Sequence, residues 1–145
     1  KNALSEKSIQ IYGDGSNIRD WIHVTDNVEA IIQVMLNGRN GETYNIGGEN
    51  ELSNLEIVNL ICDTLDRLKP KRDKKYSNLI KFVKDRPGHD MRYAININKI
   101  KSSLSWSPKI SFNQGIEDSI KWMITNKNWL LSKSNQEGRI GLSKD

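Results

Sequence analysis

The chain has 145 residues and a formal net charge of +4, with 36% hydrophobic and 28% charged residues. A chain of this length and hydrophobic content can bury a core as a single domain, and its composition is not that of a disordered segment. The one cysteine, Cys62, cannot form an internal disulfide and stands in an apolar helical run, so we expect it to be buried. No apolar run reaches membrane-spanning length and no signal peptide is visible, so we expect a cytoplasmic protein with no membrane partner.

A positive net charge can serve nucleic-acid binding, but most of the lysines are scattered along the sequence. The one basic cluster, at residues 69–75, has no aromatic side chains between its charges on which bases could stack. We therefore expect a solvated loop there and no nucleic-acid partner.

The first predicted elements are a short strand at residues 9–11, a tight turn at residues 13–17 and an extended stretch at residues 18–24. Glycine and short polar residues fill the turn, as the backbone angles of tight turns require. Arg19 therefore lies on a short extended segment between a turn and the next helix. The simplest structural role of its neighbour Asp20 is to pair with Arg19.

An amphipathic helix is predicted next. Thr25 or Asp26 is expected to cap its start, and a cap is a simpler role for Asp26 than that of a catalytic acid. Gly38 is expected to adopt the left-handed conformation at its end. The predicted apolar face of this helix consists of Val28, Ile31, Ile32 and Met35.

The middle of the chain alternates between strand and helix patterns, as in an α/β fold. Residues 42–47 predict a strand that ends in glycines. Ser53 and Glu56 form a capping box that opens a helix ending before Pro70. After a charged loop, residues 79–83 alternate like a half-buried strand.

The last third predicts a short strand at residues 92–95 and a short helix near residues 98–104. A second capping box at residues 111–114 opens a helix that continues to about residue 124. Trp106 and Trp129 are better explained as packing residues than as part of a cofactor site.

The segment that follows the 79–83 strand is the most informative of the chain and reads Asp85-Arg86-Pro87-Gly88-His89-Asp90. Pro87 fixes φ and Gly88 permits a positive φ, so the chain can turn sharply and direct Arg86 into a cleft. Arginine is the side chain best shaped for bidentate contact with phosphate. The simpler alternative is a polar surface turn with a solvated ion pair, in which His89 is a surface residue.

Three stretches, at residues 11–30, 42–48 and 85–95, resemble the carboxy-terminal portion of dTDP-glucose 4,6-dehydratases, members of the extended short-chain dehydrogenase/reductase superfamily. The motifs follow the family's order and spacing, and the resemblance runs from about Ser8 to about Leu131. Related nucleotide-sugar epimerases and decarboxylases share looser versions. The resemblance implies an α/β fold of short strands and helices, the carboxy-terminal portion of the extended short-chain dehydrogenase/reductase fold without its main amino-terminal dinucleotide-binding half. It implies that residues 1–131 bind substrate and that residues 132–145 form a tail.

The resemblance also implies a nucleotide-sugar site. Arg19 and Arg86 would contact the diphosphate, and Asn45 would be a polar contact in the substrate cleft. The remaining implied residues shape the nucleotide pocket around the base and ribose: Ile11, Tyr12, Asp85, Pro87, Gly88 and His89. Gln10 stands where the family often has a proline, which leaves open which base is bound.

Several motifs of the family are absent from this sequence. It contains no Gly-rich dinucleotide loop, no Tyr-x-x-x-Lys pair and no Thr-Asp-Glu motif, and it begins with Lys1 rather than a methionine. We therefore expect the substrate-binding part of a lyase that is inactive alone, without catalytic, cofactor-binding or metal-binding residues. The complete enzyme would bind NAD in its other half, act on a dTDP-sugar and form a homodimer. The alternatives are a part of another nucleotide-sugar epimerase or decarboxylase, and a non-catalytic nucleotide-sugar-binding module.

Overall fold

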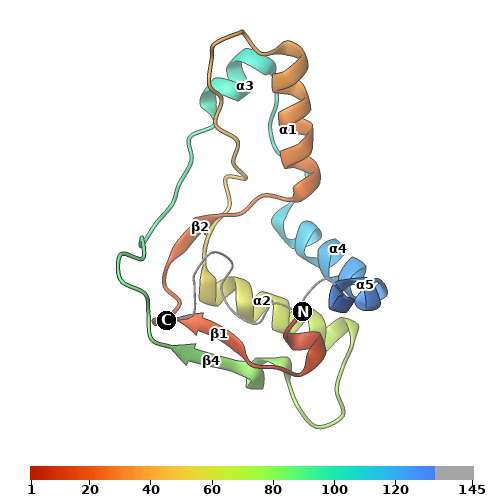
Figure 1. Ribbon diagram of the computed structural model, residues 1–145. Helices are drawn as coiled ribbons and strands as arrows, with labels where there is room; N and C mark the ends of the chain where they lie inside the picture. Colours follow the sequence, from red (N-terminus) through yellow and green to blue (C-terminus); the bar gives the residue numbers. More distant parts are fainter. Residues whose placement is uncertain (133–145) are drawn as a thin grey trace.

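The computed structural model describes residues 1–132, so almost all of the predicted tail, residues 133–145, lies outside the described residues. Short strands and helices alternate along the chain, as the α/β prediction requires (Figure 1). In chain order the elements are η1 (Ala3–Ser5), β1 (Ile9–Tyr12), β2 (Ile18–Asp20), α1 (Val24–Asn37), β3 (Glu51–Ser53), α2 (Asn54–Leu68), η2 (Tyr76–Leu79), β4 (Ile80–Val83), α3 (Asn98–Leu104), α4 (Phe112–Thr125) and α5 (Lys127–Ser132).

Two small sheets organise one end of the molecule. β1 pairs in parallel with β4, so that Tyr12 lies opposite Val83 at their carboxyl ends. β2 pairs antiparallel with β3, and its Arg19 lies opposite Leu52. Because the carboxyl ends of β1 and β4 coincide, the loops that follow both strands leave from the same edge.

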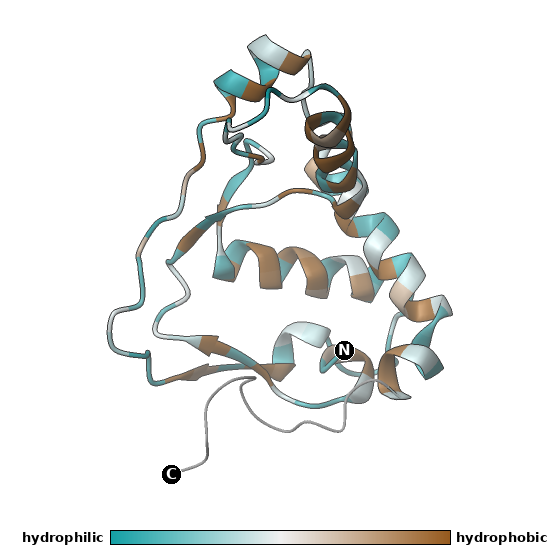
Figure 2. Cartoon of the chain, turned by 45° about the horizontal axis from the view of Figure 1, so that its top comes forward, coloured by the Kyte–Doolittle hydropathy of each residue, from teal (hydrophilic) through white to brown (hydrophobic). Residues whose placement is uncertain are grey.

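The larger hydrophobic core lies around α2. The predicted capping box is present, with Ser53 accepting from the backbone of Glu56 and Glu56 accepting from the backbone of Ser53. The apolar face of the helix is the brown side of α2 in Figure 2. Cys62 is fully buried there, as predicted. The buried residues of this core are Ala3, Leu4, Cys62, Leu65, Tyr76 and Ile120.

A second, smaller core lies at the opposite end, where α1 and α3 pack together (Figure 1). Its buried residues are Ala30, Ile97, Ile100 and Trp106. Two extended segments, residues 42–50 and 92–97, connect this end to the sheets. The shape is therefore that of two small cores joined by extended chain.

The predicted ends of α1 are wrong. The structure places the N-cap at His23, whose Nδ1 accepts from the backbone N–H of Thr25 at 3.3 Å. Asp26 is instead buried, with 2% of its surface exposed, and accepts the backbone N–H groups of Lys109 and Ile110. Gly38 has a φ of −69°, so it is not left-handed. Its lack of a side chain matters for another reason, because a Cβ there would lie 2.5 Å from the carbonyl oxygen of Val34.

Two predicted strands are also absent from the described structure. Residues 42–47 are extended but have no pairing partner within residues 1–132. Of residues 92–95, only Arg92 pairs, in a single bridge with Ile18. The 18–24 stretch forms a strand only as far as Asp20, because β3 pairs with residues 18–20 alone, and α1 begins at Val24. An alternating pattern permits a strand, but only a neighbouring strand can complete its hydrogen bonds.

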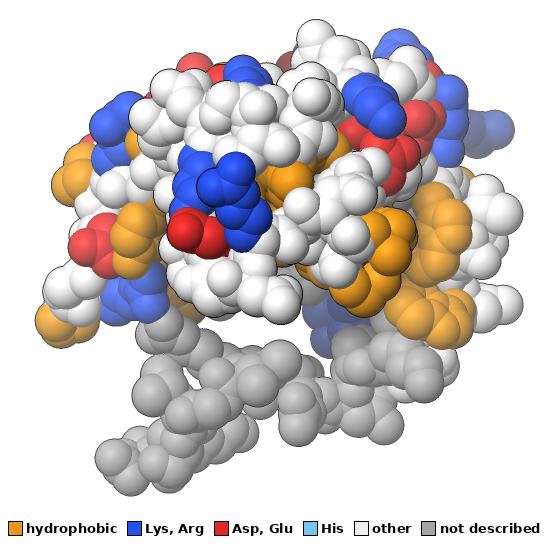
Figure 3. Space-filling model, turned by 90° about the horizontal axis from the view of Figure 1, so that it is seen from above, with side chains coloured by type: hydrophobic (Ala, Val, Ile, Leu, Met, Phe, Trp, Pro, Cys, Tyr) orange, Lys and Arg blue, Asp and Glu red, His pale blue; other side chains and the backbone are white. Residues whose placement is uncertain are grey.

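The predicted apolar face of α1 is largely exposed. Exposed fractions reach 51% at Ile31 and 73% at Met35. Figure 3 shows hydrophobic side chains among the charged ones on the surface seen from above. Contiguous exposed apolar surface of this kind is typical of a face that packs against another part or partner. Within residues 1–132, no helix is long and apolar enough to cross a membrane.

Candidate functional site

The candidate site is built on the loops that leave the carboxyl ends of β1 and β4. The backbone N–H of Gly13 donates to the carbonyl of Val83 at 2.9 Å, which joins the two loops at their start. Gly13 has a φ of +60°, and a Cβ there would lie 3.1 Å from Oδ2 of Asp85. A glycine is thus needed both for the turn and for the close approach of the second loop.

The loop that follows β4 is hydrogen-bonded to β2 and to the residue before it. Asn17, only 2% exposed, donates from Nδ2 to the carbonyl of Asp90 at 3.2 Å. The backbone N–H of Ile18 donates to Met91 at 2.7 Å, and that of Tyr93 donates to Ile18 at 3.1 Å. These bonds hold residues 90–93 beside residues 17–19, although more than 70 residues separate them in sequence.

Arg19 is held at this junction by three contacts. Its Nη1 donates to the carbonyl of Ile18 at 2.6 Å, and its Nη2 donates to the carbonyl of Asp90 at 3.0 Å. Its Cζ lies 4.5 Å from the centre of the Tyr93 ring. A guanidinium has five N–H donors, so these contacts leave donors for an anionic ligand.

Arg86 lies at the same edge, in the exposed part of the loop. Its backbone N–H donates to Oδ1 of Asp85 at 2.8 Å, which helps to shape the turn. The hydrogen bond with Asp90 raises the pKa of the Tyr93 hydroxyl, and the positive charges of Arg19 and Arg86 both act to lower it. Arg19 bonds to the carbonyl of Asp90, four residues after Arg86, so the structure places both predicted arginines at the loop that follows β4.

A hydrogen bond between two of its own side chains stabilises the predicted turn at residues 85–90. Nδ1 of His89 lies 2.8 Å from Oδ1 of Asp85, and this hydrogen bond lowers the pKa of the Asp85 carboxyl. Only 8% of the His89 side chain is exposed, so it is not the surface residue of the simpler alternative. Gly88 takes a φ of +67°, as the turn prediction requires, and lies with Pro87 at the exposed tip.

The other predicted residues fall in different places. Tyr12 is 43% exposed at the end of β1 and can line a ligand, whereas Ile11 is 3% exposed and packs beneath the turn at Gly15. Asn45 lies on the unpaired segment and donates from Nδ2 to the carbonyl of Asn96 at 3.4 Å. The structure therefore places Asn45 beside Asn96, on the extended segment 92–97.

Asp20 does not pair with Arg19. Its carboxylate accepts the backbone N–H groups of Gly48 at 3.0 Å and Asn50 at 2.9 Å. A Cβ on Gly48 would collide with the carbonyl oxygen of Trp21, so this glycine permits the close approach. Asp20 thus joins β2 to the loop before β3.

Sequence reasoning missed two residues that hold the site together, Asn17 and Tyr93. The turn prediction for residues 13–17 includes Asn17, but its burial depends on a contact with a distant loop. The strand prediction for residues 92–95 includes Tyr93. The available signal was its position three residues after Asp90, within the same motif as Arg86.

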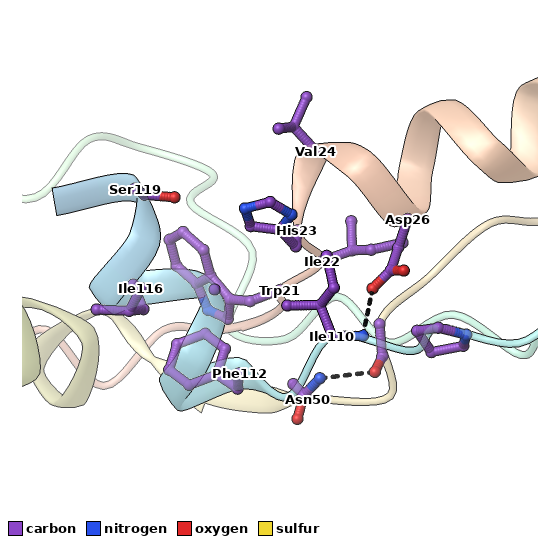
Figure 4. A pocket seen from close by; sticks show the side chains of 13 residues that line it. Trp21, Ile22, His23, Val24, Asp26, Asn50, Ile110, Phe112, Ile116 and Ser119 are labelled. Atoms are coloured by element: carbon purple, nitrogen blue, oxygen red, sulfur yellow. Dashed lines mark hydrogen bonds between the residues drawn. The ribbon is translucent and has the colours of Figure 1, made fainter. Parts of the chain in front are cut away.

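A separate apolar pocket of about 280 Å³ lies between the start of α1 and α4 (Figure 4). Among the lining residues that the structure describes, the one carboxylate belongs to Asp26, which accepts the backbone N–H groups of Lys109 and Ile110. Neither lysine nor arginine is found among its described lining residues. The pocket therefore suits an apolar group rather than a diphosphate. Its apolar lining includes Trp21, Ile22, Val24, Ile110, Phe112 and Ile116.

The described residues do not fit a dinucleotide site. A dinucleotide needs a strand, a Gly-rich loop and a helix whose N-terminus meets the pyrophosphate. β1 leads through Gly13 and Gly15 into β2, not into a helix, and β4 leads into an extended segment. In residues 1–132 no group of three or more His, Cys, Asp or Glu side chains could hold a metal ion.

Comparison with known proteins places this geometry in a family. The family model described as GDP-mannose 4,6 dehydratase matches residues 1–119. The chain belongs to this family. It is 48% identical over 129 residues to a dTDP-glucose 4,6-dehydratase of Shigella flexneri, an alignment that covers 89% of this chain but 36% of the relative. The chain thus spans little more than a third of that relative's length.

Solved structures of the family share the fold. A dTDP-glucose 4,6-dehydratase from Bacillus anthracis in complex with NAD superposes with a TM-score of 0.76 at 45% identity, covering 88% of this chain and 38% of that one. DesIV, a dTDP-glucose 4,6-dehydratase from Streptomyces venezuelae with NAD and TYD bound, gives 0.79 at 36% identity, covering 88% and 37%. The predicted α/β fold of the extended short-chain dehydrogenase/reductase type is confirmed.

Proposed function

We propose that this chain binds the nucleoside diphosphate part of a dTDP-sugar within a dTDP-glucose 4,6-dehydratase, a lyase. The observation that carries the proposal is the hydrogen bond from Arg19, on β2, to the carbonyl of Asp90, in the loop after β4 that also carries Arg86. Relatives that carry this activity in their names, with identities of 36% and 48%, support the choice of substrate.

The chemistry of the site fits a diphosphate. Two guanidinium groups can each make charge-assisted, bidentate hydrogen bonds with phosphate oxygens. Arg19 is already fixed by Ile18, Asp90 and Tyr93, while Arg86 lies on a turn braced by the pair of Asp85 and His89. Tyr12, exposed at the end of β1, offers an aromatic ring on which a base can stack. The site can therefore bind both ends of a nucleoside diphosphate.

The remaining parts of the reaction lie outside the site described above. We propose that NAD and the acid–base groups belong to another part of the complete enzyme, because the described residues of this chain provide no dinucleotide loop. The exposed apolar face of α1 and the unpaired segment 42–47 are the surfaces that we propose pack against that part. We further propose, as the family resemblance implies, that the complete enzyme is a homodimer.

Substitution of the arginines tests the proposed function. Arg19→Ala or Arg86→Ala should each remove a charge-assisted contact and weaken dTDP binding by about tenfold to a hundredfold. Arg86→Lys should recover only part of the loss, because an ammonium cannot reproduce the planar fork. Isothermal titration calorimetry of the full chain with dTDP gives the dissociation constants.

Lys74→Ala is the matched control, since Lys74 is an exposed cation of the 69–75 loop. It should leave the dissociation constant unchanged. Equal losses in Arg86→Ala and Lys74→Ala would mean that general positive charge binds the ligand, and the nucleotide-sugar site would have to be abandoned.

A further inference from the structure

Tyr93 has a position that neither the sequence motifs nor the proposed function explains. The residue is 51% exposed, yet its side chain and its backbone are both held by hydrogen bonds. The hydroxyl donates to the carboxylate of Asp90, and the backbone N–H donates to Ile18 at 3.1 Å. An exposed aromatic side chain restrained in this way presents its face in a defined direction.

That face is covered by the guanidinium of Arg19, whose Cζ lies 4.5 Å from the ring centre. Arginine stacks on aromatic faces through its planar cation, and this contact restricts rotation of the guanidinium. The bonds from Arg19 to the carbonyls of Ile18 and Asp90 hold two of its guanidinium nitrogens. Ring and carbonyls together therefore hold the guanidinium in one orientation.

We propose that Tyr93 is a positioning residue that acts through Arg19. An arginine side chain loses much rotamer freedom when it is fixed on a ligand, which costs binding free energy. With Tyr93 beneath it, the Arg19 guanidinium is ordered before the ligand arrives. Asp90 contributes by orienting the ring and by accepting from Arg19 through its carbonyl. This inference rests on the proposed function, because it presumes that Arg19 contacts the diphosphate.

The test compares Tyr93→Leu and Tyr93→Phe by titration calorimetry of the full chain with dTDP. Tyr93→Leu removes the ring and should weaken binding by about threefold to tenfold. Tyr93→Phe keeps the ring and should retain most of the affinity, with a loss below about twofold. Tyr44→Leu is the matched control, because it removes a ring that lies 5.0 Å from the ammonium of Lys99, at the α1 and α3 end of the molecule. It should bind dTDP as the unmodified chain does.

A double-mutant cycle with Arg19→Ala separates positioning from a merely structural role. In the Arg19→Ala background, Tyr93→Leu should cause almost no further loss, because the group that it orders is gone. An equal loss in both backgrounds would overturn the proposal, since Tyr93 would then act independently of Arg19. Unchanged dTDP binding by Tyr93→Leu, with binding weakened in Arg19→Ala, would overturn it as well.

Thymidine, which lacks the diphosphate, serves as a second probe. Its binding should be the same in Tyr93→Leu and the unmodified chain. If Tyr93→Leu weakened thymidine and dTDP equally, Tyr93 would contact the nucleoside or support the fold, and the proposal would be wrong. The proposed function fails separately: if Arg19→Ala and Arg86→Ala both bound dTDP as the unmodified chain does, the site itself would be refuted.

Discussion

Replacement of Asp26 should destabilise the chain strongly, because this carboxylate joins the start of α1 to the segment that leads into α4. It is 2% exposed and accepts the backbone N–H groups of Lys109 at 3.2 Å and Ile110 at 3.0 Å. A buried donor left without a partner costs roughly 1–3 kcal/mol. Asp26→Ala leaves two such donors, so we expect a loss of about 2–4 kcal/mol, near the lower part of the summed range because one bond is long. For a chain of this size that corresponds to a decrease of about 7–14 °C in the melting temperature.

Urea denaturation followed by circular dichroism measures this free energy of unfolding. Asp26→Asn should cost less, about 1–3 kcal/mol, because its amide retains one accepting oxygen. Asp63→Asn is the control, since Asp63 is an exposed aspartate on a helix, and it should change the stability by less than about 0.5 kcal/mol. A loss below 1 kcal/mol for Asp26→Ala would refute the reasoning, because water would then replace the carboxylate without cost.

Two further predictions concern groups whose pKa the fold shifts. Burial raises the pKa of the Cys62 thiol to about 11. Iodoacetamide should therefore alkylate this thiol only after the chain is unfolded in urea, which mass spectrometry detects. Rapid alkylation of the folded chain would contradict the burial of Cys62. Arg67 and then Lys121 lower the pKa of the half-buried Glu117 from 4.5 to about 2, so these two ion pairs stabilise the fold above about pH 4.5 and lose their effect as the pH falls toward 2. At neutral pH, the melting temperature of Glu117→Gln should therefore be lower than that of the unmodified chain. Near pH 2 the two melting temperatures should be the same. A difference in melting temperature that persisted at the lowest pH would contradict this linkage.

The features that the sequence predicted well depend on local chemistry. The capping box of α2 needs only Ser53 and Glu56, three residues apart, and it forms as expected. Gly88 adopts the positive φ that only glycine takes freely. The strand predicted at residues 79–83 is present at residues 80–83, although Leu79 belongs to the preceding 3-10 helix and Phe82, expected on the buried face, is exposed.

The features that the sequence could not predict depend on distant partners. Asp26 looked like a helix cap because its partners, Lys109 and Ile110, lie more than 80 residues away in sequence. The pairing expected between Asp20 and Arg19 fails because adjacent side chains of a strand point to opposite faces. Residues 42–47 have the pattern of a strand, but pairing needs a second strand, which residues 1–132 do not provide.

For the candidate site too, the local features could be predicted from the sequence and the features that depend on distant partners could not. Arg19 and Arg86 could be proposed from their motifs, because arginine beside a tight turn is a common phosphate ligand. Their placement near each other depends on the bonds between residues 17–19 and residues 90–93, which no local pattern reveals. Asn45, implied only by the resemblance, hydrogen-bonds to Asn96, and its role in binding stays a prediction.

The location of bound dTDP is the most direct test of the central claim, and a titration of the ¹⁵N-labelled full chain followed by NMR can map it. The amide signals of residues 13–19 and 85–93 should shift and saturate together, because those loops carry Arg19, Arg86 and Tyr93. Signals from the apolar pocket between α1 and α4, such as those of His23 and Ser119, should stay in place. Shifts concentrated at that pocket, with the two arginine loops unaffected, would show that the nucleotide binds elsewhere and that the proposed site is wrong.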